Sequence, residues 1–66
     1  MDKEKIIELI ESRRGSMSVA SAARIAGVSQ SGWQRMAKGQ IVPTLDMLIV
    51  MGAAVGVDIK VAVHGG

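Results

Sequence analysis

The sequence predicts a small, mostly α-helical domain with four to five helices and a short β-strand at its C-terminal end. Three observations support this fold class. Hydrophobic residues recur at helical spacing through most of the chain, glycines divide that part into short segments, and the pattern changes to alternation from residue 57 onward. The 66 residues are enough for one domain, and their 48% hydrophobic content is that of a globular protein.

The first helix is expected over residues 3–14. Its isoleucines and its leucine share one arc of a helical wheel, while Glu4, Glu8 and Glu11 lie in the opposite arc and face solvent. Gly15 then ends the helix, because glycine readily adopts the left-handed backbone that closes many helices. This segment is therefore predicted to pack one apolar side on a core.

Two shorter helices are expected next. Residues 19–26 form the first of them, which begins after a serine that suits a helix N-cap and stops at Gly27. Its apolar side chains, Ile25 among them, are expected to face inward. Ser29 offers a new N-cap almost at once, so a further helix is predicted over residues 30–38.

The helix at 30–38 has two sharply different faces. One arc of its wheel is wholly apolar and includes Trp33 and Met36. The other arc offers amide, hydroxyl and cationic groups without any acid. A face that is merely solvated ordinarily mixes both signs of charge, so this one favours a polyanionic partner. Its residues are Gln30, Ser31, Gln34, Arg35 and Lys38.

The basic residues concentrate in the same part of the chain. The formal net charge is only +2. Residues 13–38 nevertheless hold five bases and no acid, whereas residues 1–12 hold four acids and two bases, a balance of −2. A basic block of this kind indicates nucleic acid as a partner.

A fourth helix is predicted from residue 45 to about residue 55, after Pro43 and the capping Thr44. It is apolar around almost its whole circumference, and a domain this small covers only one side of it. Residues 57–63 then alternate as a strand, which in a helical chain needs a partner strand from a second subunit. Both features predict a homodimer. The expected interface comprises Met47, Val50, Met51, Ala54, Val57, Ile59, Val61 and Val63.

Two segments carry a family pattern: A-A-R-I-A-G-V-S-Q-S-G-W-Q-R-M-A-K-G at 22–39 and I-V-P-T-L-D-M-L-I-V-M-G-A-A-V-G-V at 41–57. They resemble the helix-turn-helix of lambda-repressor-like (Xre/Cro) DNA-binding domains. In that family an alanine lies four residues before a turn glycine, and apolar residues follow the glycine at fixed distances. The matching residues here are Ala23, Gly27, Val28, Trp33 and Met36.

The resemblance implies a sequence-specific transcriptional regulator, an (auto)repressor that binds a pseudo-palindromic double-stranded DNA operator as a homodimer. Residues 1–56 would form the DNA-binding domain and residues 57–66 the dimerisation strand and tail. Helix 30–38 would enter the major groove, where amides and guanidinium groups pair with base edges. Base contacts are expected from Gln30, Ser31, Gln34 and Arg35. Phosphate contacts are expected from Lys38, Arg24, Arg14, Arg13 and Ser29.

A second function stays open on the same residues. Small repressor-like antitoxins share the pattern, so the chain could be an interaction module whose main role is to bind a partner toxin or another protein. The apolar fourth helix and the valine-rich strand suit that role as well as they suit dimerisation. A regulator of a phage or another mobile element belongs to the same biochemical class as the first hypothesis.

Other classes of function find little support. The single histidine, His64, lies beside two glycines near the end of the chain, and no nucleophile has a base near it in sequence, so we expect no enzyme, no cofactor and no metal site. The charged start and the absence of a long apolar run argue against secretion and membrane insertion. Without cysteine, the expected location is cytoplasmic.

Overall fold

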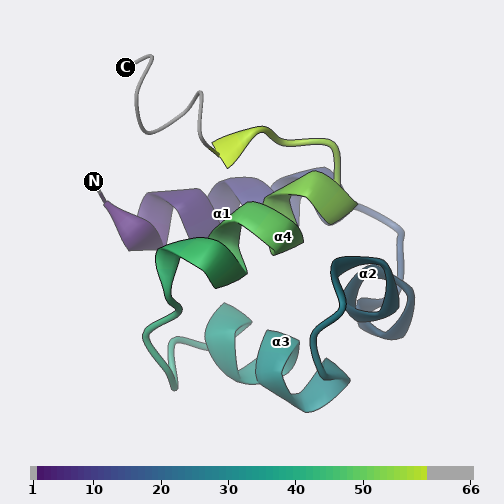
Figure 1. The fold of residues 1–66 in the computed structure, drawn as a ribbon, viewed down its shortest axis with the longest axis horizontal. Helices are drawn as coiled ribbons and strands as arrows, with labels where there is room; N and C mark the ends of the chain where they lie inside the picture. The colour runs from purple at the N-terminus through teal and green to yellow at the C-terminus, as the bar shows by residue number, and fades with distance from the viewer. Residues whose placement is uncertain (1, 60–66) are drawn as a thin grey trace.

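Four α-helices make up the regular structure of residues 2–59, the part of the chain that the computed structural model describes. α1 and α4 lie side by side, α3 lies below them, and α2 stands at one end, where it packs on both α3 and α4 (Figure 1). The mostly helical fold class is therefore confirmed. The four helices are α1 (Lys3–Arg14), α2 (Val19–Ala26), α3 (Gln30–Ala37) and α4 (Leu45–Ala54).

Each helix begins where the sequence provides a capping side chain. The Asp2 carboxylate accepts a hydrogen bond from the Glu4 backbone N–H at 3.1 Å. Ser18, Ser29 and Thr44 each accept one from the backbone N–H three residues further on, at 2.9–3.1 Å. These side chains satisfy N–H groups that have no partner within the helix, and each such cap stabilises a helix by about 1 kcal/mol.

The core combines side chains from all four helices with one residue that follows them. Trp33 is fully buried at its centre, in a chain that has no other aromatic residue. Burial of a large apolar side chain contributes about 1.5–3 kcal/mol, so these residues carry most of the stability. The buried hydrophobic residues are Ile6, Ile10, Ala22, Ala23, Trp33, Met36, Leu48, Met51 and Ile59.

Residues 57–59 fold back onto α4. The Val57 N–H donates to the Gly52 carbonyl at 2.8 Å, and Ile59 is only 1% exposed. A Cβ added at Gly52 would lie 2.5 Å from Ile59 Cγ1, so the close approach requires glycine there. The helical domain therefore extends to residue 59, past the boundary predicted after residue 56.

Two of the predicted dimer residues are buried inside a single chain. Met51 and Ile59 belong to the core, and neither offers surface to a second copy. The expected strand does not form over residues 57–59, because Val57 and Asp58 lie in no helix or strand and Ile59 is helical. The rest of the predicted strand, residues 60–63 with Val61 and Val63, lies outside the described residues.

Some of the exposed surface is apolar. Ile25 is 63% exposed, so its predicted place on the inner side of α2 is wrong, whereas Ala22 and Ala23, which the pattern also places on that side, are buried. Val50 is 40% exposed on the outer side of α4, as the pattern of that helix predicted. None of the helices in the described part of the chain combines the length and the hydrophobicity that crossing a bilayer would need.

Candidate nucleic-acid interface

A three-residue turn, residues 27–29, connects α2 to α3. Gly27 has φ 77° and ψ 24°, the left-handed conformation that glycine adopts without strain. Its N–H and that of Val28 both donate to the Ala23 carbonyl, at 2.9 and 3.0 Å, which closes α2. Ser29 returns to an extended backbone and caps α3 at once. The turn therefore brings two short helices into contact at a fixed angle.

The orientation of α3 is set by its buried side. Trp33 and Met36 are both fully buried, and they hold one side of the helix against the core. The opposite side points away from the protein, so the two-faced division predicted for this segment is confirmed. The exposed residues on that polar face are Gln30, Ser31, Gln34, Arg35 and Lys38.

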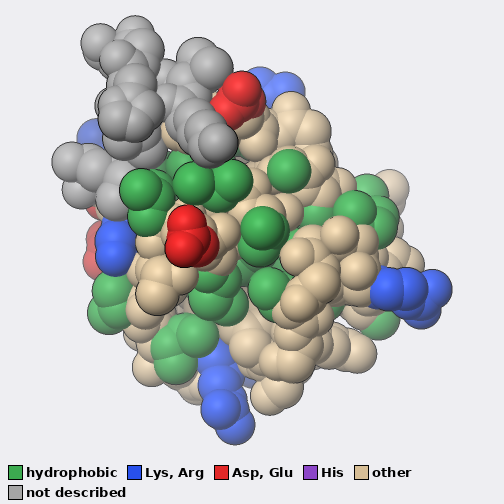
Figure 2. Space-filling model, viewed as in Figure 1, with side chains coloured by type: hydrophobic (Ala, Val, Ile, Leu, Met, Phe, Trp, Pro, Cys, Tyr) green, Lys and Arg blue, Asp and Glu red, His purple; other side chains and the backbone are tan. Residues whose placement is uncertain are grey.

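The charged side chains of α2 and α3 are all positive, while Glu4 and Glu8 of α1 line a hollow together with Lys38 at the end of α3. α2 and α3 contain no acidic residue, and the part of the surface that covers them shows Lys and Arg side chains without Asp or Glu (Figure 2). Within residues 13–38, four exposed bases form neither an ion pair nor a side-chain hydrogen bond. Their charges are free to meet an external anion. They are Arg13, Arg24, Arg35 and Lys38.

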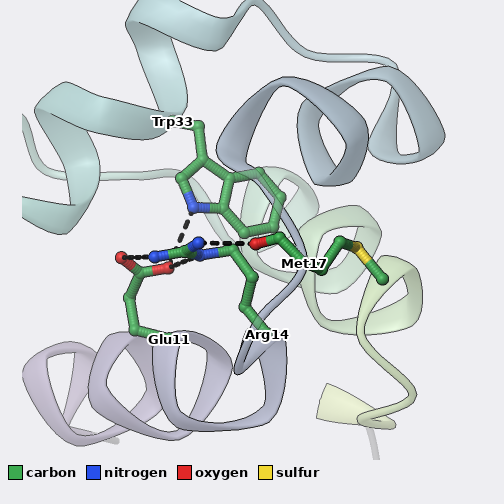
Figure 3. A network of polar contacts seen from close by, with 4 residues as sticks. All are labelled: Glu11, Arg14, Met17 and Trp33. Carbon is green, nitrogen blue, oxygen red and sulfur yellow. Dashed lines mark hydrogen bonds and ion pairs between the residues drawn. The ribbon is translucent and has the colours of Figure 1, made fainter.

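Arg14 does not belong to this group. Its Nε lies 2.7 Å from Glu11 Oε2 and its side chain is 22% exposed. A second guanidinium nitrogen donates to Glu11 Oε1 at 3.3 Å, and a third donates to the Met17 carbonyl at 2.6 Å (Figure 3). The hydrogen bonds to Glu11 also raise the pKa of Arg14 above its usual value. Three of its five guanidinium N–H groups are therefore used inside the protein, so Arg14 is less available to an external anion than the four bases above, and its predicted phosphate contact stays a prediction.

Glu11 departs from its predicted place on the solvent side of α1. Its Oε2 accepts a hydrogen bond from the indole Nε1–H of Trp33 at 3.1 Å, across 22 positions of sequence (Figure 3). The hydrogen bonds from Arg14 lower the pKa of Glu11, against the opposing effect of partial burial, and the bond from Trp33 lowers it further. Glu11 thus remains a carboxylate at neutral pH and links α1 to α3.

Ser29 has a structural role beside the one predicted for it. Its Oγ accepts the Gly32 N–H at 2.9 Å as the cap of α3. A Cβ added at Gly32 would lie 2.9 Å from that oxygen, which explains why a glycine stands inside so short a helix. Ser29 is exposed, so its hydroxyl can still donate to an external group.

The loop after α3 carries exposed apolar side chains that the sequence did not single out. Val42 is 80% exposed and Ile41 is 37% exposed. Lys3 donates from Nζ to the carbonyl of the buried Pro43 at 2.9 Å, which fastens this loop to α1. The two apolar side chains are thus held out beside the end of α3.

No family model, curated protein or solved structure matches the chain. The described residues also contain no group of three His, Cys, Asp or Glu side chains that could hold a metal ion. What the site offers is a protruding helix face that presents two amides, a hydroxyl, a guanidinium and an ammonium group. Such groups donate to and accept from base edges and phosphates.

Proposed function

We propose that the protein is a sequence-specific double-stranded DNA-binding regulator that places α3, the second helix of a helix-turn-helix, in the major groove. The observation that carries this proposal is the exposed, acid-free polar face of α3, opposite the buried Trp33. The major groove of B-DNA admits one helix. The amides of Gln30 and Gln34 suit adenine, and the guanidinium of Arg35 suits guanine.

The remaining bases suit the DNA backbone. Lys38 lies at the end of α3, Arg24 on the last turn of α2, and Arg13 near the end of α1. All three are exposed and without an ionic partner among residues 2–59. Contacts from such side chains to phosphates fix the register of a protein on the duplex and make its affinity depend on salt.

A dimer completes the proposed regulator. The described residues extend 30 Å along their longest axis, which is less than the roughly 34 Å between successive major grooves on one side of B-DNA. One copy also presents a single α3 and would read one half-site. Hydrophobic side chains gather on the surface over α4 (Figure 2), and their outer members Leu45 and Val50 suit a second copy. Two copies related by a two-fold axis would read a pseudo-palindrome, as an autorepressor does.

Selection from random duplexes tests this function. The wild-type protein is incubated with a pool of random-sequence duplexes at moderate salt, and the bound fraction is sequenced after several rounds. We expect a symmetric consensus with two half-sites about one helical turn apart. Enrichment of no sequence, at low salt as well as at moderate salt, would contradict the proposal.

A second candidate function is the binding of a protein partner, as a repressor-like antitoxin binds its toxin. The observation in its favour is the exposure of Ile25 and Val42, which is high for side chains of this type on so small a protein. The variants Ile25→Ser and Val42→Ser distinguish DNA binding from binding of a protein partner. Both variants should select the same consensus as wild type if DNA is the main ligand.

A further inference from the structure

We propose that Glu11 is a positioning residue: its carboxylate fixes α3 against α1 through Trp33 and so sets the angle at which the polar face of α3 meets DNA. The proposal rests on the DNA-binding function proposed above and names the group that governs its geometry. Glu11 itself lies on α1 and belongs to none of the expected DNA contacts.

The hydrogen bond from Trp33 to Glu11 differs in kind from the other contacts of α3 with the rest of the protein. In the described part of the chain it is the one hydrogen bond or ion pair that joins a side chain of α3 to another helix. The core that α1 and α3 share is formed by apolar side chains, and apolar burial has no preferred direction. A hydrogen bond weakens steeply when its angle changes, so this one resists rotation of the helix.

Trp33 is well placed to transmit this restraint. It precedes Gln34 and follows Gln30 by three residues, so any rotation of α3 about its axis that moves the indole also moves both amides. The indole is fully buried, and the bond joins it to a carboxylate that is itself only partly exposed. Base readers must be held within about 0.5 Å and 10–20° of their productive geometry, a tolerance that a single fixed anchor can meet.

Arg14 keeps the anchor charged and in place. Its guanidinium binds both oxygens of Glu11, and its third contact, to the Met17 carbonyl, reaches the turn that leads into α2 (Figure 3). One carboxylate is thereby linked to α1, to the α1–α2 turn and to α3. Hydrogen bonds to a charged group are shorter and stronger than those between neutral groups, so the arrangement depends on the charge of Glu11.

The test compares Glu11→Gln with Glu8→Gln. Each removes one negative charge from α1, but Glu8 is exposed and touches none of Arg14, Met17 and Trp33 through a hydrogen bond. The probes are the duplex that the wild type selects and a random-sequence pool of the same length. Binding is measured well below the melting temperature, with helical circular dichroism as the check of folding. Trp33 is the single tryptophan, so intrinsic fluorescence reports on the anchor alone.

We expect Glu11→Gln to weaken binding to the selected duplex about tenfold, the factor that corresponds to one charge-assisted hydrogen bond of ordinary strength, and binding to the random pool less than about twofold. Its Trp33 emission should also differ from wild type. Glu8→Gln should change the two affinities by a common factor and leave the emission unaltered. Arg14→Lys keeps the positive charge but loses the guanidinium that binds both oxygens of Glu11, so it should show a weaker form of the same effect. This variant serves as the test if Glu11→Gln does not fold.

For each variant, the affinity for the selected duplex is divided by the affinity for the random pool. If this ratio is the same for Glu11→Gln and Glu8→Gln, the positioning role is overturned and DNA binding is left intact. Unchanged Trp33 emission in Glu11→Gln would overturn the anchor itself. A wild-type protein that selects no sequence would overturn the proposed function, and the positioning role with it. The three failures are therefore distinguishable.

Discussion

The role of each residue in α3 depends on the side of the helix on which it lies. Trp33 and Met36 are buried and contribute to stability, whereas Gln30 and Gln34 are exposed and their side chains form no hydrogen bond within residues 2–59. Sequence alone predicted this division, because it follows from the helical period within one segment. It did not predict the bond between Trp33 and Glu11, because that bond depends on how α1 and α3 pack.

Gln30→Ala and Gln34→Ala test base reading. Each should broaden the selected consensus at one symmetric pair of positions and cost about 1–3 kcal/mol of binding free energy, because an amide that pairs with a base is lost. Thermal unfolding should stay close to wild type, since both side chains are exposed. Gln40→Ala, at an exposed glutamine outside α3, is the matched control. If both α3 variants select the unchanged consensus, α3 is not the reader.

Lys38→Ala tests the backbone contact. Binding to selected and random duplexes should weaken alike, because a phosphate contact carries no sequence information. The slope of log affinity against log salt should become shallower by about 0.9, the value for one released counterion. Lys5→Ala removes an exposed lysine from the first half of α1, outside the expected DNA contacts, and should leave the slope unaltered. A Lys38→Ala slope equal to that of wild type would remove Lys38 from the interface.

The pKa of Glu11 makes a prediction about acid stability. Folding lowers this pKa below its ordinary value of 4.5, so the unfolded chain binds the proton first as the pH falls. The resulting stabilisation is complete above the ordinary value and is lost as the pH falls through the folded value. In urea unfolding, the stability advantage of wild type over Glu11→Gln should therefore shrink below about pH 4.5. A stability advantage of wild type over Glu11→Gln that stays constant down to pH 2 would contradict this prediction.

At the scale of helices and turns, the sequence predicts where each helix begins and ends better than it predicts which side of a helix is buried. Caps such as Ser18 and Thr44 and the turn glycine Gly27 are local signals, and the helices start and end where these residues stand. The buried side of α2 is different, because a helix of 8 residues has few positions from which to locate its inner face. Ala22 and Ala23 allow a close helix approach, and Ile25 is consequently turned outward.

Gly52→Ala tests how residues 57–59 are held on α4. Alanine favours a helix by about 1 kcal/mol over glycine, so an unobstructed site would gain stability. Here the new Cβ would lie 2.5 Å from Ile59 Cγ1 and 2.9 Å from the Val57 carbonyl oxygen, and that backbone must move. We expect a net loss of about 1–3 kcal/mol in the free energy of unfolding, as for other overpacked cores.

The Ile59→Ala background is the control for this substitution. Without most of the Ile59 side chain, Gly52→Ala should cost less, and the difference measures the coupling between the two positions. A stabilised Gly52→Ala protein would show that residues 57–59 do not pack on α4 as described.

At the scale of the whole molecule, the acid-free polar surface of α2 and α3 and the apolar surface of α4 lie on different helices. Four of the acids lie on or beside α1, which also carries four bases, and none lies on α2 or α3. The charge of those two helices is therefore positive and would attract a polyanion. The apolar surface of α4 is on a different helix from the polar face of α3. A second copy bound at α4 would leave that polar face uncovered, and so dimerisation and DNA binding are compatible.

Val50→Lys tests the proposed dimer. It places a charge on the exposed apolar side of α4, where Val50 is 40% exposed, and burial of an unpaired charge opposes association strongly. Ser12→Lys adds the same charge at an exposed position on α1 and serves as the control. Sedimentation should show dimers for wild type and Ser12→Lys and monomers for Val50→Lys, at the same micromolar concentration. The monomer should still bind a half-site weakly, because its α3 is unchanged, and should lose its preference for two half-sites in symmetric order. Wild-type protein that sediments as a monomer would exclude this interface.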